Sequence, residues 1–142
     1  MILLTSILYF EIGRFTPKKI FDKAINSVVE VKSTATDVAT TYGTAVFIAD
    51  DGVLITNAHV VTYDVLGEIF VYDVCSIRFA TAEDYIPVKI VKYDIDKDLA
   101  VLKMENEAVD YRSIKIGNVK DLDYGEEVYA VGNALNYGLS IT

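Results

Sequence analysis

A chain of 142 residues, of which 52% are hydrophobic, is long enough to bury a sizeable core and too apolar to be disordered. We therefore expect one globular domain over residues 1–142. The formal net charge of −8, without any basic cluster, argues against a nucleic-acid partner, because nothing is present to displace phosphate counterions. The single cysteine, Cys75, excludes an internal disulfide and a cysteine-based zinc site, and its apolar neighbours favour a buried, unreactive thiol.

Residues 1–10 form an apolar run at the start of the chain. No lysine or arginine precedes this run and no small-residue cleavage site follows it, so it does not fit a secretory signal peptide. Ten residues are also too few to cross a bilayer as a helix. We expect residues 1–15 to be an apolar N-terminal segment that covers an apolar surface as a strand or helix, and we do not expect membrane contact.

A short helix is predicted to begin at Thr16-Pro17 and to end near Ile25, because threonine suits the N-cap and proline the first helical position. Its apolar side chains share one face: Ile20, Phe21, Ala24 and Ile25. A first strand is predicted to follow at residues 27–32, where valines predominate.

The next segment predicts a β-hairpin. Residues 44–49 and 53–56 are small, β-branched or aromatic, and the intervening Asp-Asp-Gly at residues 50–52 has the composition of a turn. This hairpin leads directly to the only histidine in the chain, His59.

His59 is predicted to lie on one helical turn just beyond a strand end. Asn57 is a good N-cap for a turn over residues 58–61, which would hold the histidine by backbone hydrogen bonds on both sides. A lone histidine is more often an ordinary surface or core residue than a catalyst, so its role depends on what surrounds it.

The rest of the chain predicts short strands separated by turns. After a loop at 61–67, the segments expected to form strands are 68–79 (long and bent), 85–93, 99–104 (short and buried), 127–132 and 139–142. In the segment 85–93 the side chains expected to point inward are Ile86, Val88 and Ile90, with Val91 as a further candidate. One early helix and about seven strands predict an all-β, antiparallel barrel rather than a βαβ sheet.

Acidic residues mark the turn before the strand at 99–104. Asp94, Asp96 and Asp98, followed by Glu105, have the spacing of calcium ligands in an EF-hand loop. Position six of such a loop is a glycine but is Leu99 here, and the flanks are strand-like, so a solvated acidic turn is the better interpretation.

Three segments of the chain carry recognisable motifs. The first holds Gly43-Thr44, the Asp-Gly at 51–52 and Thr-Asn-Ala-His-Val-Val at 56–61. The second is Asp-Leu-Ala-Val-Leu-Lys at 98–103, and the third is Ala-Val-Gly-Asn at 130–133. Together these segments resemble the trypsin-like serine proteases, above all the HtrA/Deg branch, although Ala45 and Val46 replace a glycine and an aromatic residue of the family pattern and Ala134 replaces a proline.

The resemblance implies the six- to seven-stranded N-terminal trypsin-like barrel of a serine endopeptidase over residues 16–142, acting on polypeptides without a cofactor or metal. His59 would be the general base and Asp98 the carboxylate that orients it. Independently, a histidine base needs a carboxylate on Nδ1–H to fix its tautomer, and a half-shielded carboxylate at Asp98 needs the hydrogen-bond donors that His59 and nearby amides can supply.

The family's nucleophilic serine lies in a Gly-x-Ser-Gly-Gly segment of a second barrel, and no such segment occurs in these 142 residues. Ser140 matches a strand position of the family, so it is not a candidate nucleophile. We therefore expect two of the three triad positions here, with the second barrel absent and this chain inactive alone.

Two other functions remain open: a catalytically inactive barrel that acts as a binding or interaction module, and a calcium-binding domain that uses the acidic cluster. A lone barrel would expose apolar surface, so we expect a homo-oligomer. The composition points to no compartment, whereas the family resemblance implies the cell envelope or secretion.

Overall fold

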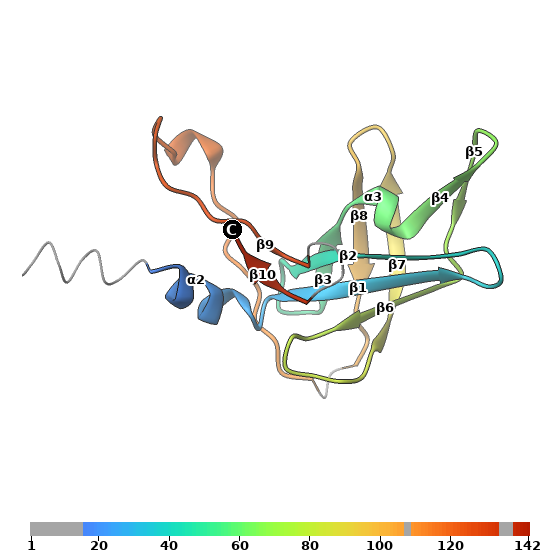
Figure 1. Ribbon diagram of the computed structural model, residues 1–142, viewed down its shortest axis with the longest axis horizontal. Coiled ribbons are helices and arrows are strands. Elements are labelled where there is room, and N and C mark those ends of the chain that lie inside the picture. The colour runs from blue at the N-terminus through green and yellow to red at the C-terminus, as the bar shows by residue number, and fades with distance from the viewer. Residues whose placement is uncertain (1–15, 107–108, 134–137) are drawn as a thin grey trace, which may run out of the picture.

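The computed structural model describes residues 16–106, 109–133 and 138–142 (Figure 1). The N-terminal segment at 1–15, which the sequence predicts to cover an apolar surface, lies outside these residues, as does Ala134. Within the described ranges, no helix is long and apolar enough to cross a membrane.

A closed antiparallel barrel with the strand order β1-β2-β3-β8-β7-β6 forms the body of the domain (Figure 1). The prediction of a six- to seven-stranded all-β barrel with a short N-terminal helix is confirmed. The barrel strands are β1 (Val28–Ala35), β2 (Ala39–Phe47), β3 (Val53–Thr56), β6 (Val74–Arg78), β7 (Ile86–Asp94) and β8 (Leu99–Lys103).

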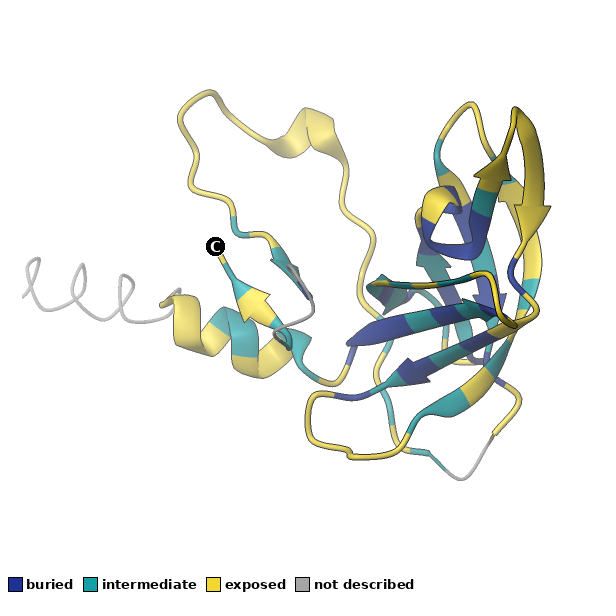
Figure 2. Cartoon of the chain, turned by 45° about the vertical axis from the view of Figure 1, so that its right-hand side comes forward, coloured by how far each residue is buried: buried dark blue, intermediate teal, exposed yellow. Residues whose placement is uncertain are grey.

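The core fills the barrel because alternate residues of each strand point inward. The largest fully buried side chains include Val29, Phe47, Leu54, Ile77 and Leu102, and Figure 2 shows buried positions alternating with less buried ones along these strands. Cys75 is buried among them, as predicted, and burial raises the pKa of its thiol, which makes it unreactive.

Three smaller elements flank the barrel at one end. Helix α2 (Pro17–Ala24) has Thr16 at its N-cap and proline in its first turn, and its four predicted apolar positions are the half-buried ones. It lies beside the two-stranded pair of β9 (Val131–Gly132) and β10 (Ser140–Ile141) (Figures 1 and 2). A short 3₁₀ helix, η1 (Val119–Asp121), precedes that pair.

The largest difference from the sequence prediction is a separate hairpin after α3 (Ala58–Val61). The predicted loop at 61–67 is instead β4 (Thr62–Val65), which pairs with β5 (Glu68–Val71), so the predicted long strand at 68–79 is divided between β5 and β6. The turn consists of Leu66 and Gly67, both at positive φ (55° and 90°), as a two-residue hairpin turn requires.

Four strand predictions are also corrected. Val91 is 61% exposed, as strand alternation requires, because Ile86, Val88 and Ile90 pack on the core as predicted; a β-bulge lies between Ile90 and Lys92. The strand at 99–104 is half-buried, since Leu99 is exposed and Ala100 is buried. The predicted strands at 127–132 and 139–142 shrink to β9 and β10.

Helix α3 packs against the barrel at a glycine. Gly43 of β2 faces Val60, and a Cβ at position 43 would lie 2.5 Å from Val60 Cγ2. Val60 is itself buried, so it has no free space into which it can move. Glycine at this position is therefore what lets the turn that carries His59 sit close to β2.

We predict that Gly43→Ala lowers the free energy of unfolding by about 1–3 kcal/mol, because the new methyl group overpacks the contact with Val60. Urea unfolding followed by circular dichroism measures this change. Gly117→Ala is the matched control, since nothing lies within 4 Å of a Cβ there. Equal stability of the two variants would contradict the close-packing argument.

Candidate active site

The pairing of β3 with β8 brings His59 and Asp98 to the same end of the barrel. Thr56 at the end of β3 pairs with Ala100, so the turn after β3 and the turn before β8 become neighbours. Thr56 is buried, and its hydroxyl donates a hydrogen bond of 2.7 Å to the Thr44 carbonyl oxygen, which fixes the end of β3 against β2.

The α3 turn exposes one side chain. Ala58, Val60 and Val61 are buried, whereas His59 points outward with 70% of its side chain exposed. The Thr62 hydroxyl closes the turn by donating to the Ala58 carbonyl oxygen at 2.9 Å. Burial of the other three residues therefore determines where His59 points.

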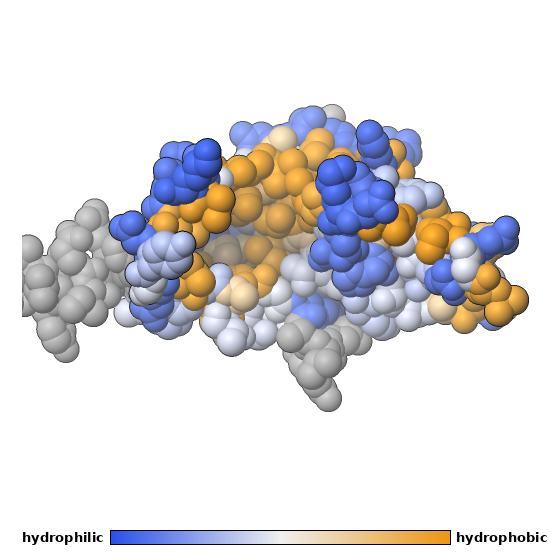
Figure 3. Space-filling model, turned by 90° about the horizontal axis from the view of Figure 1, so that it is seen from above, coloured by the Kyte–Doolittle hydropathy of each residue, from blue (hydrophilic) through white to orange (hydrophobic). Residues whose placement is uncertain are grey.

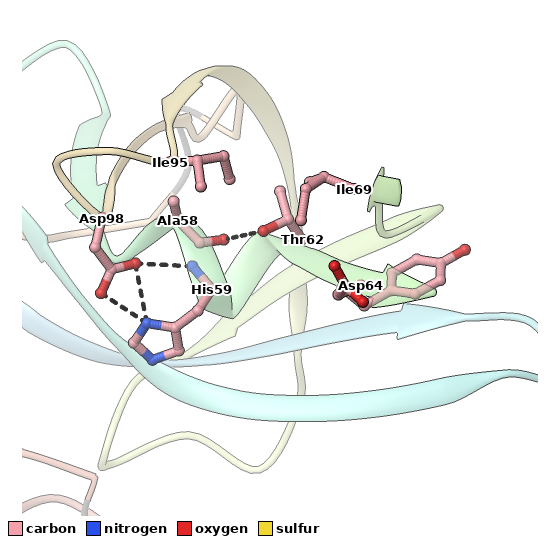
Figure 4. Close-up of a pocket in the computed structure, with 8 residues that line it drawn as sticks. Ala58, His59, Thr62, Asp64, Ile69, Ile95 and Asp98 are labelled. Carbon is pink, nitrogen blue, oxygen red and sulfur yellow. Dashed lines mark hydrogen bonds and ion pairs between the residues drawn. The ribbon is translucent and has the colours of Figure 1, made fainter. Parts of the chain in front are cut away.

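Asp98 comes from the turn between β7 and β8. Its backbone N–H donates to the Ile95 carbonyl oxygen at 3.1 Å, and its φ of 51° lies in the left-handed region. Aspartate tolerates this region better than most residues, although the conformation still stores some strain. The turn directs the Asp98 carboxylate toward α3 (Figure 4).

His59 and Asp98 meet as the sequence predicted. His59 Nδ1 lies 2.8 Å from Asp98 Oδ2 and 3.0 Å from Oδ1, and the His59 backbone N–H donates to Oδ1 at 3.0 Å (Figure 4). A carboxylate can only accept, so Nδ1 must carry the proton, and in a neutral ring Nε2 is left as a base. Nε2 points away from Asp98 (Figure 4), and 70% of the His59 side chain is exposed.

Asn57 has a different role from the one predicted. It occupies the N-cap position of α3, but its side chain makes no capping hydrogen bond. Its amide instead donates to the Asp98 carbonyl oxygen at 3.1 Å and to Asp98 Oδ2 at 3.2 Å. The sequence pattern of an N-cap gave no sign of this contact, since it depends on a turn 41 residues away.

Hydrogen bonding lowers the pKa of the Asp98 carboxyl below its usual 3.8. The largest cause is donation from the His59 backbone N–H, with further contributions from the His59 ring and the Asn57 amide, while partial burial acts in the opposite direction. Asp98 is therefore ionised at neutral pH. Its contribution to stability is present above the unfolded-state pKa and is lost as the pH falls through the lowered folded-state value.

The four carboxylates of the calcium hypothesis do not converge. Asp94 pairs with Lys97 at 2.5 Å, Glu105 pairs with Lys89 at 2.6 Å, and Asp98 pairs with His59. In the part of the chain that the structure describes, no three His, Cys, Asp or Glu side chains are placed to hold a metal ion. The arrangement supports a solvated acidic turn beside an oriented histidine.

A pocket of about 320 Å³ opens next to the pair, and we call it the His59 pocket. His59 and Asp98 form one side, and Ile95 of the β7–β8 turn and Ile69 of the β4–β5 hairpin form others (Figure 4). The sequence did not indicate that Ile69 lies near His59, because it predicted a loop and one long strand where the structure has the β4–β5 hairpin. Ser140 lies in β10, where its hydroxyl donates to the Gly132 carbonyl oxygen at 3.3 Å.

Comparison with known proteins agrees with this geometry. Residues 43–142 match the family model described as a trypsin-like peptidase domain. The chain belongs to the trypsin-like peptidase family. It is 32% identical over 104 residues, or 73% of its length, to the "Probable periplasmic serine endoprotease DegP-like" of Pseudomonas fulva. It is also 33% identical over 98 residues, or 64% of its length, to "Protease Do-like 5, chloroplastic" of Arabidopsis thaliana.

Solved protease structures share the fold of this peptidase barrel. The serine endoprotease from Yersinia pestis superposes with a TM-score of 0.71 at 25% identity, over 90% of this chain and 43% of the other. The HtrA-type protease AlgW, solved with a tripeptide, superposes with a TM-score of 0.74 at 23% identity, over 90% and 38%. The described barrel thus has the trypsin-like fold that these protease structures share.

The peptidase chain spans only part of these relatives. It covers 19% of the Pseudomonas fulva protein and 29% of the Arabidopsis thaliana protein. The described site therefore corresponds to one segment of these longer proteins.

We predict that Asn57→Ala raises the pKa of the Asp98 carboxyl, because the substitution removes one hydrogen-bond donor from the ionised form. A ¹³C NMR titration of the carboxyl resonance measures the change. Asn118→Ala serves as the control, since that side chain accepts from Lys120 at the start of η1 and does not contact Asp98. An Asp98 pKa that is the same in wild type and Asn57→Ala would contradict the assigned role of Asn57.

Proposed function

We propose that this peptidase domain supplies the general base and its orienting carboxylate to a serine endopeptidase. The observation that carries this proposal is the 2.8 Å contact between His59 Nδ1 and Asp98 Oδ2, made by a ring whose Nε2 points away from the carboxylate. Such a contact fixes the tautomer that can accept a proton at Nε2. The family membership adds independent support.

In the proposed reaction, His59 Nε2 takes the proton of a serine hydroxyl as that oxygen attacks the peptide carbonyl carbon. The imidazolium that forms lies beside the Asp98 carboxylate, which stabilises it without accepting the proton. The lowered pKa of Asp98 keeps the carboxylate ionised at neutral pH, as this role requires. His59 then returns the proton to the amine that leaves.

The serine and the oxyanion-hole amides are not among the residues of this site. No Gly-x-Ser-Gly-Gly segment occurs in the 142 residues, so we infer that a second barrel supplies both groups in the intact protein. Its substrates are inferred to be polypeptides, in line with the endoprotease names of the relatives and the tripeptide in the AlgW structure.

We also propose that this chain by itself forms a homo-oligomer. Apolar side chains line a hollow on one face of the molecule (Figure 3), and a pocket of about 410 Å³ lies between β2, β3 and β9, lined in part by Val46, Ile55, Leu99 and Val131. Apolar surface of this kind is usually covered by a partner. A monomer at tens of micromolar concentration in light scattering would refute the proposal.

We predict that Asp98→Asn in the intact protein lowers kcat/KM for a peptide substrate by about 10³-fold or more, because the amide favours the wrong histidine tautomer. Asp96→Asn is the matched control, two residues away in the same turn, and it should keep near wild-type activity. The 142-residue chain alone should show no hydrolysis above background and no labelling by a fluorophosphonate.

Each outcome decides between functions. If Asp98→Asn and Asp96→Asn change the rate of hydrolysis equally, the proposed roles of His59 and Asp98 are wrong. An intact protein that hydrolyses no peptide would reject the endopeptidase and favour the inactive barrel that serves as a binding or interaction module.

A further inference from the structure

We propose that Thr44 of β2 is a positioning residue, which holds the segment after β9 in a fixed place relative to the turn that carries His59. It thereby sets the position of the second barrel, and of the serine on that barrel, relative to His59 Nε2. The inference rests on the proposed function, because that function is what requires a second barrel. It assigns a role to Thr44 that the base and its carboxylate do not explain.

The Thr44 hydroxyl accepts a hydrogen bond from the segment after β9. The Asn133 backbone N–H donates to Thr44 Oγ1 at 2.8 Å, although the two residues are 89 positions apart in the sequence. Asn133 is buried, so water does not readily replace a lost acceptor there. Thr44 is therefore an acceptor that ties this segment to the barrel.

The Thr44 backbone connects this contact to the end of β3. Its carbonyl oxygen accepts a hydrogen bond from the Thr56 hydroxyl at 2.7 Å. The residue after Thr56 is Asn57, whose amide donates to Asp98 Oδ2 at 3.2 Å, and Asp98 in turn accepts from the ring of His59. A continuous path of hydrogen bonds and adjacent residues therefore runs from the segment after β9 to the oriented histidine.

The segment approaches Thr44 closely because residue 132 is a glycine. A Cβ at Gly132 would lie 3.1 Å from Thr44 Oγ1, a tighter contact than a Cβ usually makes. Strand β9 contacts both β1 and β2, and it lies beside them in Figure 1. The hydroxyl at position 44 and the glycine at position 132 thus suit the same close contact.

The unit that Thr44 holds has hydrogen bonds of its own. Strands β9 and β10 pair with each other, and Ala130 and Thr142 exchange backbone hydrogen bonds of 2.8 and 2.9 Å. Asn133 Oδ1 also accepts from the Gly138 backbone N–H at 3.1 Å. The contact with Thr44 therefore fixes the whole β9–β10 pair, through which the proposed second barrel is connected.

Kinetics of the intact protein test the proposal. Thr44→Val keeps the shape of the side chain and suits a strand, but valine cannot accept the hydrogen bond from Asn133. We expect kcat for a peptide substrate to fall about tenfold and KM to change by less than about twofold, because a displaced base slows the chemical step more than binding. Thr44→Ser keeps the hydroxyl, so it should retain most of the wild-type kcat.

Thr40→Val is the matched control. Thr40 lies on the same strand and face as Thr44, but its hydroxyl donates to the Thr34 hydroxyl at 3.4 Å, away from β9. Its kcat should equal that of the wild type. Urea unfolding of both valine variants verifies that each one folds.

Hydrogen exchange in the 142-residue chain tests the contact without catalysis. The Asn133 amide should exchange faster in Thr44→Val than in the wild type, because its acceptor is removed, and at the wild-type rate in Thr40→Val. An Asn133 exchange rate that is the same in Thr44→Val and the wild type would overturn the assignment of Thr44.

The positioning role and the endopeptidase can fail separately. If the intact protein hydrolyses peptides and Thr44→Val keeps the wild-type kcat, the endopeptidase stands and the role of Thr44 is rejected. A kcat that falls equally in Thr44→Val and Thr44→Ser also rejects this role, since the hydroxyl is then not the cause. An intact wild-type protein that hydrolyses no peptide rejects the proposed function, and the positioning role with it.

Discussion

The Asp98 carboxylate is the group on which the geometry of the site depends. It accepts hydrogen bonds from the His59 backbone N–H, the His59 ring and the Asn57 amide, so one side chain holds both the α3 turn and the imidazole. These donors also stabilise the negative charge of the Asp98 carboxylate, since their hydrogen bonds lower the pKa of the carboxyl. Removing the carboxylate would therefore affect the ring and the backbone that carries it.

The barrel makes this contact possible through strand register and close packing. The Thr56–Ala100 pairing sets the β7–β8 turn beside α3, and the absence of a side chain at Gly43 lets α3 approach β2. Because a shift of one residue in the β3–β8 register would turn alternate side chains to the other face, the core and the site constrain each other. The His59 side chain is exposed, so its direction is set by the buried residues of α3 beside it rather than by packing of the ring itself.

The sequence predicted the contact between His59 and Asp98 but not all of its surroundings. His59 and Asp98 belong to motifs whose local pattern survives in the chain, and α2 and the barrel follow from capping and alternation. The β4–β5 hairpin was missed because its turn places Leu66 at positive φ. Leucine rarely adopts this conformation, so the sequence did not indicate a turn there. The outward position of Val91 follows from the alternation that places Ile90 inward, whereas the role of Asn57 follows from a tertiary contact and leaves no local pattern.

The tautomer of His59 tests the central claim most directly. The chain has one histidine, so a long-range ¹H–¹⁵N NMR spectrum reports on this ring without ambiguity. The account predicts that, when the ring is neutral, the proton resides on Nδ1, with Nε2 showing the shift of an unprotonated nitrogen. The same ring in Asp98→Asn should lose this preference. A neutral ring protonated on Nε2 in the wild-type chain would contradict the assignment of His59 as a base oriented by Asp98.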